Sequence, residues 1–482
     1  MVRINYVSRS FSIVTLIFLL LRSALIAAPQ TDMAAESADH DLISADYRTV
    51  ADRSIAAALA DSLAYDRLAL ICDTFGHRIS GSENLENAID WILGRMKKDG
   101  LENVHGETVM VPRWVRGAES LKLTSPFEDS IAILGLGGSI GTGSEGINAE
   151  VLVVNDSLEL EARTDEAQGK IVVYNQAFES YGKTVKYRRN GAVAAAKAGA
   201  VASLIRSVGS FSLKTPHTGA MKYDPEVREI PHAAISSEDA MMLRRIQDRG
   251  ERISLSLYME ARTENDVPSR NVVAEFRGYE KPEEIIVLGG HIDSWDVGQG
   301  AMDDAGGCVA VWEAVRLLKN LGLRPRRTIR VVLWTNEENG LRGGKGYRDQ
   351  HLDELDDHIL AIESDEGVFK PTGFGFKGSP EALKIIAEVG SLLVSINADK
   401  ITDDGGGADI SPLMKLGVPG MGLSVVRDKY FWYHHTDADT VDKLDPNELN
   451  ECIAALAVMA YVVADLPQRL PRAVENQAGV DG

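Results

Sequence analysis

Apolar residues recur at helical spacing in two stretches near the start of the chain, residues 46–70 and 83–99. Such spacing places the apolar side chains on one face, so each stretch is predicted to form a helix that packs onto a core. The segment GHRISGSEN at residues 76–84 separates them and is rich in turn-forming residues. The face of the second helix is formed by Leu85, Ile89, Ile92, Leu93 and Met96.

The pattern changes between residues 126 and 264. Gly-rich loops alternate there with short β-type runs and with the small-residue helical segment GAVAAAKAGAVASLI. This change predicts an inserted β-rich domain at 126–264. The polar stretch TENDVPSR at residues 263–270 is interpreted as a linker back to the main domain.

From residue 272 onward, apolar strand-like runs alternate with amphipathic helical segments, ending in a helix from about residue 445. This order predicts an α/β fold with a mostly parallel central sheet flanked by helices. Residues 29–125 and 265–470 are assigned to this main domain, and the polar end, 471–482, is predicted to be a flexible tail.

The first 28 residues have a different character. Arg3 and Arg9 precede the apolar run Phe11 to Leu21, and small residues follow at Ala27 and Ala28. This arrangement predicts a secretory signal peptide, and hence a secreted or periplasmic protein, with an uncleaved anchor as the alternative. No later segment is expected to reach the roughly 20 apolar residues of a membrane span.

Composition narrows the class of partner. The 482 residues carry 51 basic and 71 acidic side chains, a net charge of -20, which repels phosphate backbones and argues against nucleic acid as a partner. The three cysteines, Cys72, Cys308 and Cys452, lie far apart in apolar or helical surroundings. We therefore expect small buried side chains and no disulfide framework.

Polar side chains repeatedly follow apolar strand-like runs. GGHIDSWD follows IIVLGG, NEENG follows TIRVVLWT, and ESDEG follows ILAI. Ligands bind at the carboxyl ends of strands in open α/β sheets, so these residues are the first candidates for chemistry. His291 alone would be read as structural, but Asp293 beside it can orient its imidazole as metal-site carboxylates do.

Two pairs of adjacent acids strengthen this interpretation. Asp303 and Asp304 precede a glycine-rich helix start, where either residue could be the N-cap. Near other acids, such a pair is costly unless a cation neutralises it. Glu337 and Glu338 follow a strand directly, so that one can bind metal while the other acts as a base toward water.

Asp365 adds a further acidic strand end, and YHHTDADT supplies His434 and His435. Together with Asp303 and Glu338, these residues give an oxygen and imidazole ligand set that suits zinc. Two histidines and three carboxylates exceed the four ligands of a structural zinc site and fit two ions that share one carboxylate.

These motifs resemble those of the co-catalytic dizinc aminopeptidase-like metallopeptidases. The resemblance covers nearly the whole chain after the leader and is carried by GGHIDSWDVGQGAMDD, RVVLWTNEENG, ESDEG and FWYHHTDADT. It implies that Asp303 bridges two zinc ions and that Glu337 is the catalytic base. His291 and Asp365 would then bind one ion, Glu338 and His435 the other, and the Asp303–Asp304 peptide would be cis.

The resemblance also implies a zinc peptidase acting on dipeptides or short peptides with free termini, usually as a homodimer, with a protease-associated domain at 126–264. Tyr433, His434 and Asp409 are weaker candidates for contacting substrate, and Asp409 is better explained as a helix cap. Two alternatives stay open at this point. One is a non-catalytic receptor or binding module on the same scaffold, and the other is a single-zinc acyl transferase of the glutaminyl cyclase type.

Overall fold

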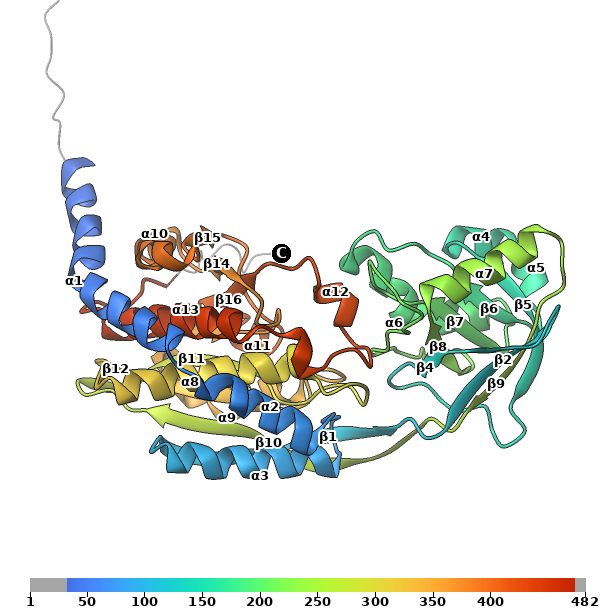
Figure 1. Cartoon of the computed structure of the whole chain (residues 1–482), viewed down its shortest axis with the longest axis horizontal. Coiled ribbons are helices and arrows are strands. Elements are labelled where there is room, and N and C mark those ends of the chain that lie inside the picture. Colours follow the sequence, from blue (N-terminus) through green and yellow to red (C-terminus); the bar gives the residue numbers. More distant parts are fainter. Residues whose placement is uncertain (1–32, 473–482) are drawn as a thin grey trace, which may run out of the picture.

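Two eight-stranded sheets organise the part of the chain that the structure describes. The structure is a computed structural model that describes residues 33–472, with side chains described from residue 43. The segment read as a signal peptide, 1–28, and residues 473–482 of the predicted tail lie outside it. The two sheets form two parts that lie side by side along the long axis of the molecule (Figure 1).

The first sheet is mixed, with parallel strands at its centre. β11 is parallel to β12 and β13, and β13 is parallel to β16, while the pairs β1–β10, β10–β12 and β14–β16 are antiparallel. The expected parallel centre is therefore present, flanked by antiparallel strands. The strand order is β1 (Glu102–Val115), β10 (Arg262–Phe276), β12 (Arg327–Trp334), β11 (Lys281–His291), β13 (His358–Glu363), β16 (Gly420–Val425), β14 (Pro371–Lys377) and β15 (Lys400–Thr402).

Alternation along β11 explains why helices cover both faces of this sheet. Ile286 and Leu288 belong to the larger apolar core on one face, whereas Ile285 and Val287 belong to a smaller core on the other. The larger core is completed by α1 (Met33–Leu59), α2 (Leu63–Phe75), α3 (Glu83–Lys98), α8 (Gly306–Asn320), α10 (Pro380–Gly390) and α13 (Pro446–Asp465). The smaller core is covered by α9 (Arg342–Gln350) and α11 (Ser411–Met414).

The first predicted helix is two helices. α1 ends at Leu59 and α2 begins at Leu63. Between them, the Asp61 carboxylate accepts a hydrogen bond from the backbone N–H of Leu63, at 2.6 Å. A short acidic side chain that binds the nearby backbone in this way competes with the hydrogen bonds of a continuing helix. The break was not predicted because the apolar residues keep helical spacing across it.

The expectation that no segment after the leader is long and apolar enough to span a membrane was wrong for one helix. α13 has 20 residues and a mean hydropathy of 1.3, so by length and composition alone it could cross a bilayer. Within the protein, however, 83% of its apolar window is buried. Its apolar character is explained by its position as a buried helix of the larger core.

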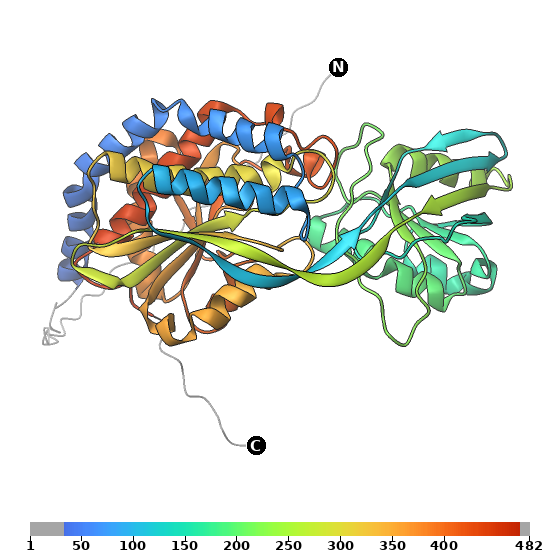
Figure 2. The same ribbon diagram turned by 90° about the horizontal axis from the view of Figure 1, so that it is seen from below.

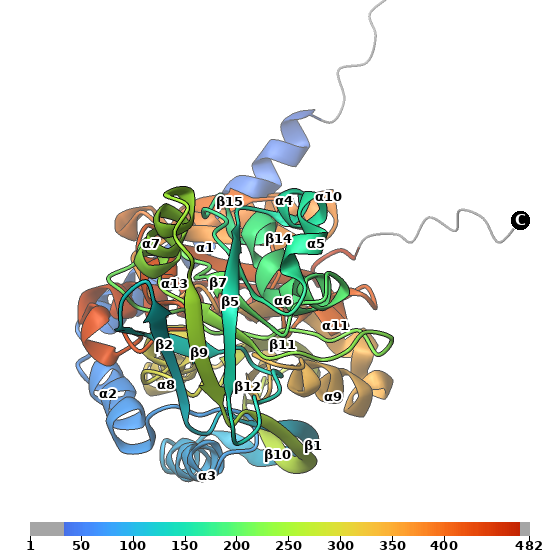
Figure 3. The ribbon, with the colours of Figure 1, turned by 90° about the vertical axis from the view of Figure 1, so that its right-hand side faces the viewer.

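The second sheet begins at Glu119, seven residues before the predicted boundary at 126, and it runs to Met259. Figure 3, which faces this end of the molecule, shows β2, β9 and β5 running side by side. The strand order is β3 (Asp129–Ile131), β2 (Glu119–Ser125), β9 (Ser254–Met259), β5 (Ile147–Val154), β6 (Ile171–Tyr174), β7 (Ala202–Arg206), β8 (His232–Ile235) and β4 (Ile133–Gly135). The helices of this part are α4 (Ser157–Ala162), α5 (Thr164–Ala167), α6 (Tyr181–Lys197) and α7 (Ser237–Asp248).

A long antiparallel ribbon joins the two parts. β1 and β10 pair along their length, with Val111 opposite Val267 and Trp114 opposite Thr263 (Figure 2). The stretch TENDVPSR, interpreted as a linker, is therefore strand: it lies in the first half of β10. The remaining short elements are α12 (Tyr430–Tyr433), a π-type turn (Ala301–Ala305) and three 3-10 turns (Leu352–Asp357, Ser391–Ile396 and Val441–Lys443).

Candidate active site

The carboxyl ends of three parallel strands meet at one edge of the first sheet. β11 ends at His291, β12 at Trp334 and β13 at Glu363. The register pairs His291 with Trp334 and Gly289 with Glu363. The loops that follow β12 and β13 therefore begin beside His291, at the edge where ligands bind in sheets of this kind.

Asp303 lies between two groups of side chains. Its Oδ1 is 3.0 Å from Nε2 of His291, and that nitrogen is 3.1 Å from Oδ1 of Asp365. Its Oδ2 is 3.3 Å from Nε2 of His435, and that nitrogen is 3.1 Å from Oε2 of Glu338. Atoms that each lie about 2.0–2.2 Å from one zinc ion are about 3–3.5 Å apart, so both groups have suitable spacing. The structure thus brings together all five predicted ligands.

The neighbouring histidines differ in what they face. His434 stacks on His435 with ring centroids 3.6 Å apart, and its Nε2 is 3.7 Å from Oδ2 of Asp303. His435 contacts both Asp303 and Glu338, whereas within the described chain His434 makes no such contact with Glu338. His435 thus contacts two of the clustered carboxylates, and His434 lies behind it near Asp303.

Asp439 holds the loop that carries Asp303, and sequence reasoning missed it. Its carboxylate accepts hydrogen bonds from the backbone N–H groups of Ala301 at 3.1 Å, Met302 at 2.7 Å and Asp303 at 3.2 Å. Burial raises the pKa of Asp439 to about 7. The only signal in the sequence is its position four residues after His435, which lets one loop supply a ligand and also support the shared carboxylate.

The two adjacent aspartates have separate roles. Their peptide bond is cis, as predicted. Asp304 accepts hydrogen bonds from the backbone N–H groups of Gly307 at 3.0 Å and His291 at 3.1 Å. Asp304 therefore satisfies the start of α8 and ties it to the end of β11, which leaves the Asp303 carboxylate free for the cluster.

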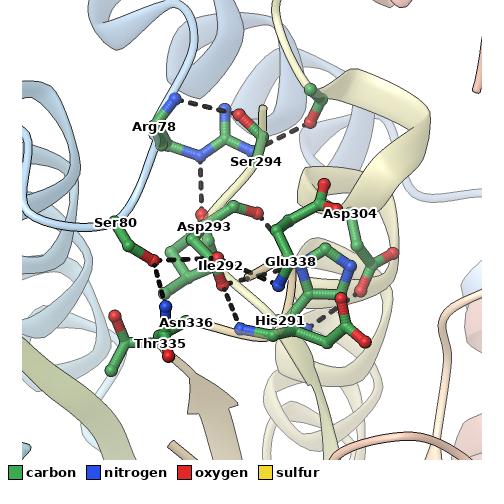
Figure 4. Close-up of polar contacts among 12 residues, drawn as sticks. Arg78, Ser80, His291, Ile292, Asp293, Ser294, Asp304, Thr335, Asn336 and Glu338 are labelled. Carbon is green, nitrogen blue, oxygen red and sulfur yellow. Dashed lines mark hydrogen bonds and ion pairs between the residues drawn. The ribbon is translucent and has the colours of Figure 1, made fainter. Parts of the chain in front are cut away.

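Asp293 supports the acidic pair more directly than it supports His291. Its carboxylate accepts hydrogen bonds from the backbone N–H groups of Glu337 at 3.0 Å and Glu338 at 3.3 Å, and from the Ser80 hydroxyl at 3.2 Å. Nδ1 of His291 is 2.9 Å from the backbone carbonyl of Asp293 and 3.7 Å from its carboxylate. The imidazole is thus oriented mainly by the carbonyl, while the carboxylate fixes the loop after β12 (Figure 4).

A buried arginine braces the segment after β11. Arg78, which has no exposed surface, donates hydrogen bonds to the carbonyls of Ile292 at 2.8 Å, Gln299 at 2.7 Å, Gly300 at 2.9 Å and Gly76 at 2.9 Å. In Figure 4 the Arg78 side chain lies next to Ser294 and Ile292. Arg78 thereby positions the chain between the ligands His291 and Asp303.

Replacing this guanidinium is expected to destabilise the protein strongly. Arg78→Met should lower the free energy of unfolding by about 3 kcal/mol or more, since each buried carbonyl left unpaired costs roughly 1–3 kcal/mol. The measurement is urea-induced unfolding. Arg113→Met is the matched control, because Arg113 is 46% exposed and pairs with Glu264 at the surface, where loss costs about 1 kcal/mol or less. Equal losses in the two variants would contradict the bracing role.

The part of the molecule that contains the second sheet also contacts the cluster. Nδ1 of His435 lies 3.2 Å from the carbonyl of Thr218 and 3.2 Å from Nη1 of Arg188. The backbone N–H of Thr218 donates to the carbonyl of His435 at 3.0 Å, and Nδ1 of His217 lies 2.8 Å from the carbonyl of His434. Sequence reasoning identified none of these supports, which position the histidine pair from outside the first sheet.

The charge balance of the cluster calls for cations. Burial raises the pKa of Glu338 to about 7, raises that of Asp365, and raises that of Glu337 well above its usual value. Oδ2 of Asp303 and Oε1 of Glu338 are buried, and neither has a hydrogen bond from any residue that the structure describes. Bound cations offset both costs, and a donor set of imidazole and carboxylate fits zinc.

Two pockets adjoin the cluster, with volumes of about 490 and 450 Å³. His434 lines both, whereas Asp409 and Tyr433 are not among the residues that line either one. The suggested helix-cap role of Asp409 is wrong, because α11 has Ile410 at its N-cap position and no capping side chain. The Asp409 carboxylate is buried and has no hydrogen-bond partner among residues 33–472.

Comparison with known proteins agrees with this site. Residues 271–460 match Peptidase family M28. Carboxypeptidase Q of Xenopus laevis is 50% identical over 429 residues, which are 88% of this chain and 92% of that protein. Carboxypeptidase Q of Homo sapiens is 50% identical over 413 residues, 86% of this chain and 88% of that protein.

Solved structures show the same fold. A Peptidase M28 precursor from Shewanella amazonensis has a TM-score of 0.86 and 35% identity, covering 90% of this chain and 100% of that one. A zinc aminopeptidase from Bacillus subtilis has a TM-score of 0.64 and 21% identity, covering 86% and 97% of the two chains, and supports the fold alone.

Fold and site together define a zinc metallopeptidase of the mixed α/β type. The chain belongs to Peptidase family M28 and, within it, to the carboxypeptidase Q group. The resemblance of the sequence motifs to the aminopeptidase-like metallopeptidases is thereby confirmed.

Proposed function

We propose that this protein is an exported two-zinc exopeptidase that hydrolyses dipeptides or short peptides with free termini. The observation that carries the proposal is the position of Asp303, whose two carboxylate oxygens face two different groups of ligands. In this scheme His291 and Asp365 would hold one ion and Glu338 and His435 the other, with Asp303 contributing to both.

Glu337 is the general base in the proposed mechanism. Zinc, when bound, supplies Lewis acidity that polarises a peptide carbonyl and makes water a stronger acid. Glu337 lines the same pocket as Asp303 and Glu338, and its backbone is fixed by Asp293. Its carboxylate accepts a proton from the attacking water and returns that proton to the leaving amine.

The remaining expectations are part of the same proposal. Residues 1–28 would be a signal peptide, with an anchor as the alternative. Residues 29–125 and 265–470 would form the peptidase domain, and residues 126–264 would form a protease-associated domain, although the sheet that contains them starts at Glu119. We further propose that the protein acts as a homodimer.

The direct test is metal analysis of the purified protein together with a dipeptide panel. Two zinc ions per chain and hydrolysis of free dipeptides are the expected results. One ion per chain without peptide hydrolysis would favour the single-zinc acyl transferase alternative. A correctly folded protein that contains neither zinc nor activity would favour a binding module.

Removing the metal is expected to weaken the fold as well as abolish activity. Zinc binds the folded state and offsets repulsion among buried acids. At a free zinc concentration 1,000 times the dissociation constant, each site adds about 4 kcal/mol to the free energy of unfolding. Chelation should therefore lower the melting temperature, measured by differential scanning calorimetry, and zinc should restore it. An unchanged melting temperature after verified removal of zinc would contradict a role for these carboxylates as ligands.

A further inference from the structure

A group of polar side chains outside the candidate active site gathers where β1 meets the end of α9. It comprises His105 and Glu107 on β1, His351 directly after α9, and Glu354 in the 3-10 turn that follows. β1 is an edge strand of the first sheet and lies beside α9 (Figure 3). None of these four residues lines either pocket beside the ligand cluster, so the group is separate from the proposed reaction centre.

Two imidazole rings in this group face the same carboxylate oxygen. Nε2 of His351 lies 2.8 Å from Oε1 of Glu107, and Nε2 of His105 lies 3.5 Å from that oxygen. His105 and Glu107 are two residues apart on a strand, so their side chains project from the same face of the sheet. Donor atoms that share one zinc ion are about 3–3.5 Å apart, and both separations are close to that spacing.

The second nitrogen of each ring is held by an acceptor. Nδ1 of His105 lies 2.7 Å from the carbonyl of Asn103, and Nδ1 of His351 lies 3.0 Å from Oε2 of Glu354. We assign the proton to Nδ1 in both rings because these oxygens can only accept. Nε2 then keeps its lone pair, which is the form in which histidine binds a metal, and a carbonyl or carboxylate at Nδ1 is the usual support for such a ligand.

Glu107 has an acceptor atom that the protein does not satisfy. Its side chain is 7% exposed, and Oε2 is buried with no hydrogen-bond partner in the described part of the chain. A buried carboxylate oxygen without a donor is destabilising, and buried charges in proteins are normally paired or bound to a metal. A cation bound by Glu107 would remove this cost.

The charges around the two rings favour a divalent cation. Arg330 approaches Nδ1 of His351 at 3.4 Å and pairs with Glu275 at 2.8 Å and with Glu354 at 3.3 Å. Together with Glu107, the carboxylates of this network exceed its one guanidinium by two negative charges when both histidines are neutral. A dication at Glu107 would balance this excess.

A proton on His351 competes with a metal for the same place. Burial lowers the pKa of His351, but Glu107 and Glu354 raise it more, so that the pKa lies above its usual value. The protonated ring forms ion pairs with these two acids, whereas a metal requires the neutral ring. Metal binding is therefore best measured slightly above neutral pH, where it releases this proton.

We propose that His105, Glu107 and His351 form an additional zinc site that ties β1 to the end of α9, with Glu354 as a positioning residue for His351. Imidazole together with carboxylate suits zinc, whereas calcium and magnesium prefer oxygen ligands alone. Three protein ligands and one water molecule make up the four positions that zinc prefers. His105 is 43% exposed, so its imidazole can turn toward His351 as the ion binds.

This site is expected to bind zinc more weakly than the ligand cluster around Asp303, because one of its ligands is exposed and moves on binding. Dialysis should therefore empty it, and added zinc should fill it. The inference does not depend on the proposed peptidase function, since the site shares no residue with the ligand cluster.

The experiment titrates zinc into the dialysed full-length protein by isothermal titration calorimetry. The wild-type protein should take up one zinc ion per chain beyond those that it keeps through dialysis. His105→Gln should weaken this uptake by more than the roughly 10- to 100-fold that follows loss of a residue that only orients a ligand, and Glu354→Gln should weaken it by about that factor. Both side chains are largely exposed, at 43% and 48%, so both variants should fold.

Glu102→Gln is the matched control. Glu102 begins the same strand, is 47% exposed and faces Arg324 at 3.6 Å, so the substitution removes a negative charge without touching the site. This variant should bind the additional ion as tightly as the wild-type protein does. No additional uptake by the wild-type protein would overturn the inference. Equal uptake by His105→Gln would also overturn it, and would identify adventitious zinc on the acidic surface.

Thermal unfolding gives a second readout and separates this inference from the proposed function. Added zinc should raise the melting temperature of the dialysed wild-type protein and of Glu102→Gln, but not that of His105→Gln. Zinc content after dialysis and kcat on a dipeptide should be the same in His105→Gln and in the wild-type protein. An inactive wild-type protein that still takes up an ion through His105 would defeat the proposed function and leave the additional site supported. An equal shift of the melting temperature in all three proteins would reject the site.

Discussion

Glu337→Gln is expected to lower kcat by roughly 10²- to 10⁴-fold while the zinc content stays unchanged. Glutamine keeps the shape of the side chain but cannot accept the proton that the reaction requires. Glu337 is not one of the five clustered ligands, and the N–H groups of residues 337 and 338 stay bound to Asp293, so the Glu338 ligand should keep its place. The measurements are kcat on a dipeptide and zinc content by plasma mass spectrometry.

The control for this substitution is Glu381→Gln, which removes one negative charge at an exposed position in the first turn of α10. Its kcat should equal that of the wild-type enzyme. A Glu337→Gln protein with full zinc and nearly unchanged kcat would remove Glu337 from the proposed role. Loss of zinc along with activity would instead show that Glu337 takes part in metal binding.

The ligands were predictable from the sequence because of one geometric rule. Parallel strands place their carboxyl ends at one edge of a sheet, so residues that follow different apolar runs converge without any other information. His291, Glu338 and Asp365 each follow such a run. Asp303 and His435 lie in loops outside the strands, and their selection depended on the resemblance to a family.

The supporting residues were harder to predict because they bind backbone atoms or side chains that are distant in sequence. Asp439 holds three backbone N–H groups, Arg78 holds carbonyls, and Arg188 reaches His435 across 247 positions of sequence. The pattern of side-chain types along the sequence does not show which polar side chain will bind a backbone N–H or carbonyl group. Such contacts become visible only when the loops are folded.

The organisation of the chain was predicted better at its apolar elements than at its polar ones. β11, β12 and β13 were evident from their buried runs. The first half of β10 was read as a linker because it is polar and contains Pro268. Along residues 262–271 its recorded strand partner is β1, and a two-stranded ribbon with little burial does not require apolar alternation.

Asp303→Ala is expected to remove both zinc ions together and to reduce kcat/KM by far more than the roughly 10- to 100-fold typical of losing a supporting contact. The reason is that both groups of ligands include this one carboxylate, through Oδ1 toward His291 and Oδ2 toward His435. Without it, each ion would have only two of the three proposed protein ligands. Zinc content per chain and kcat/KM on a dipeptide are the measurements, with circular dichroism to verify folding.

Asp439→Asn is the informative comparison, because Asp439 supports the loop of Asp303 through backbone N–H groups and is not one of the clustered ligands. It should keep measurable zinc and lose roughly 10- to 100-fold in kcat/KM. If Asp303→Ala retained one full zinc ion per chain, the two groups would bind metal independently and the shared carboxylate would not be a bridge. Loss of both ions in Asp303→Ala, beside retained zinc in Asp439→Asn, would assign the bridging role to the Asp303 carboxylate itself.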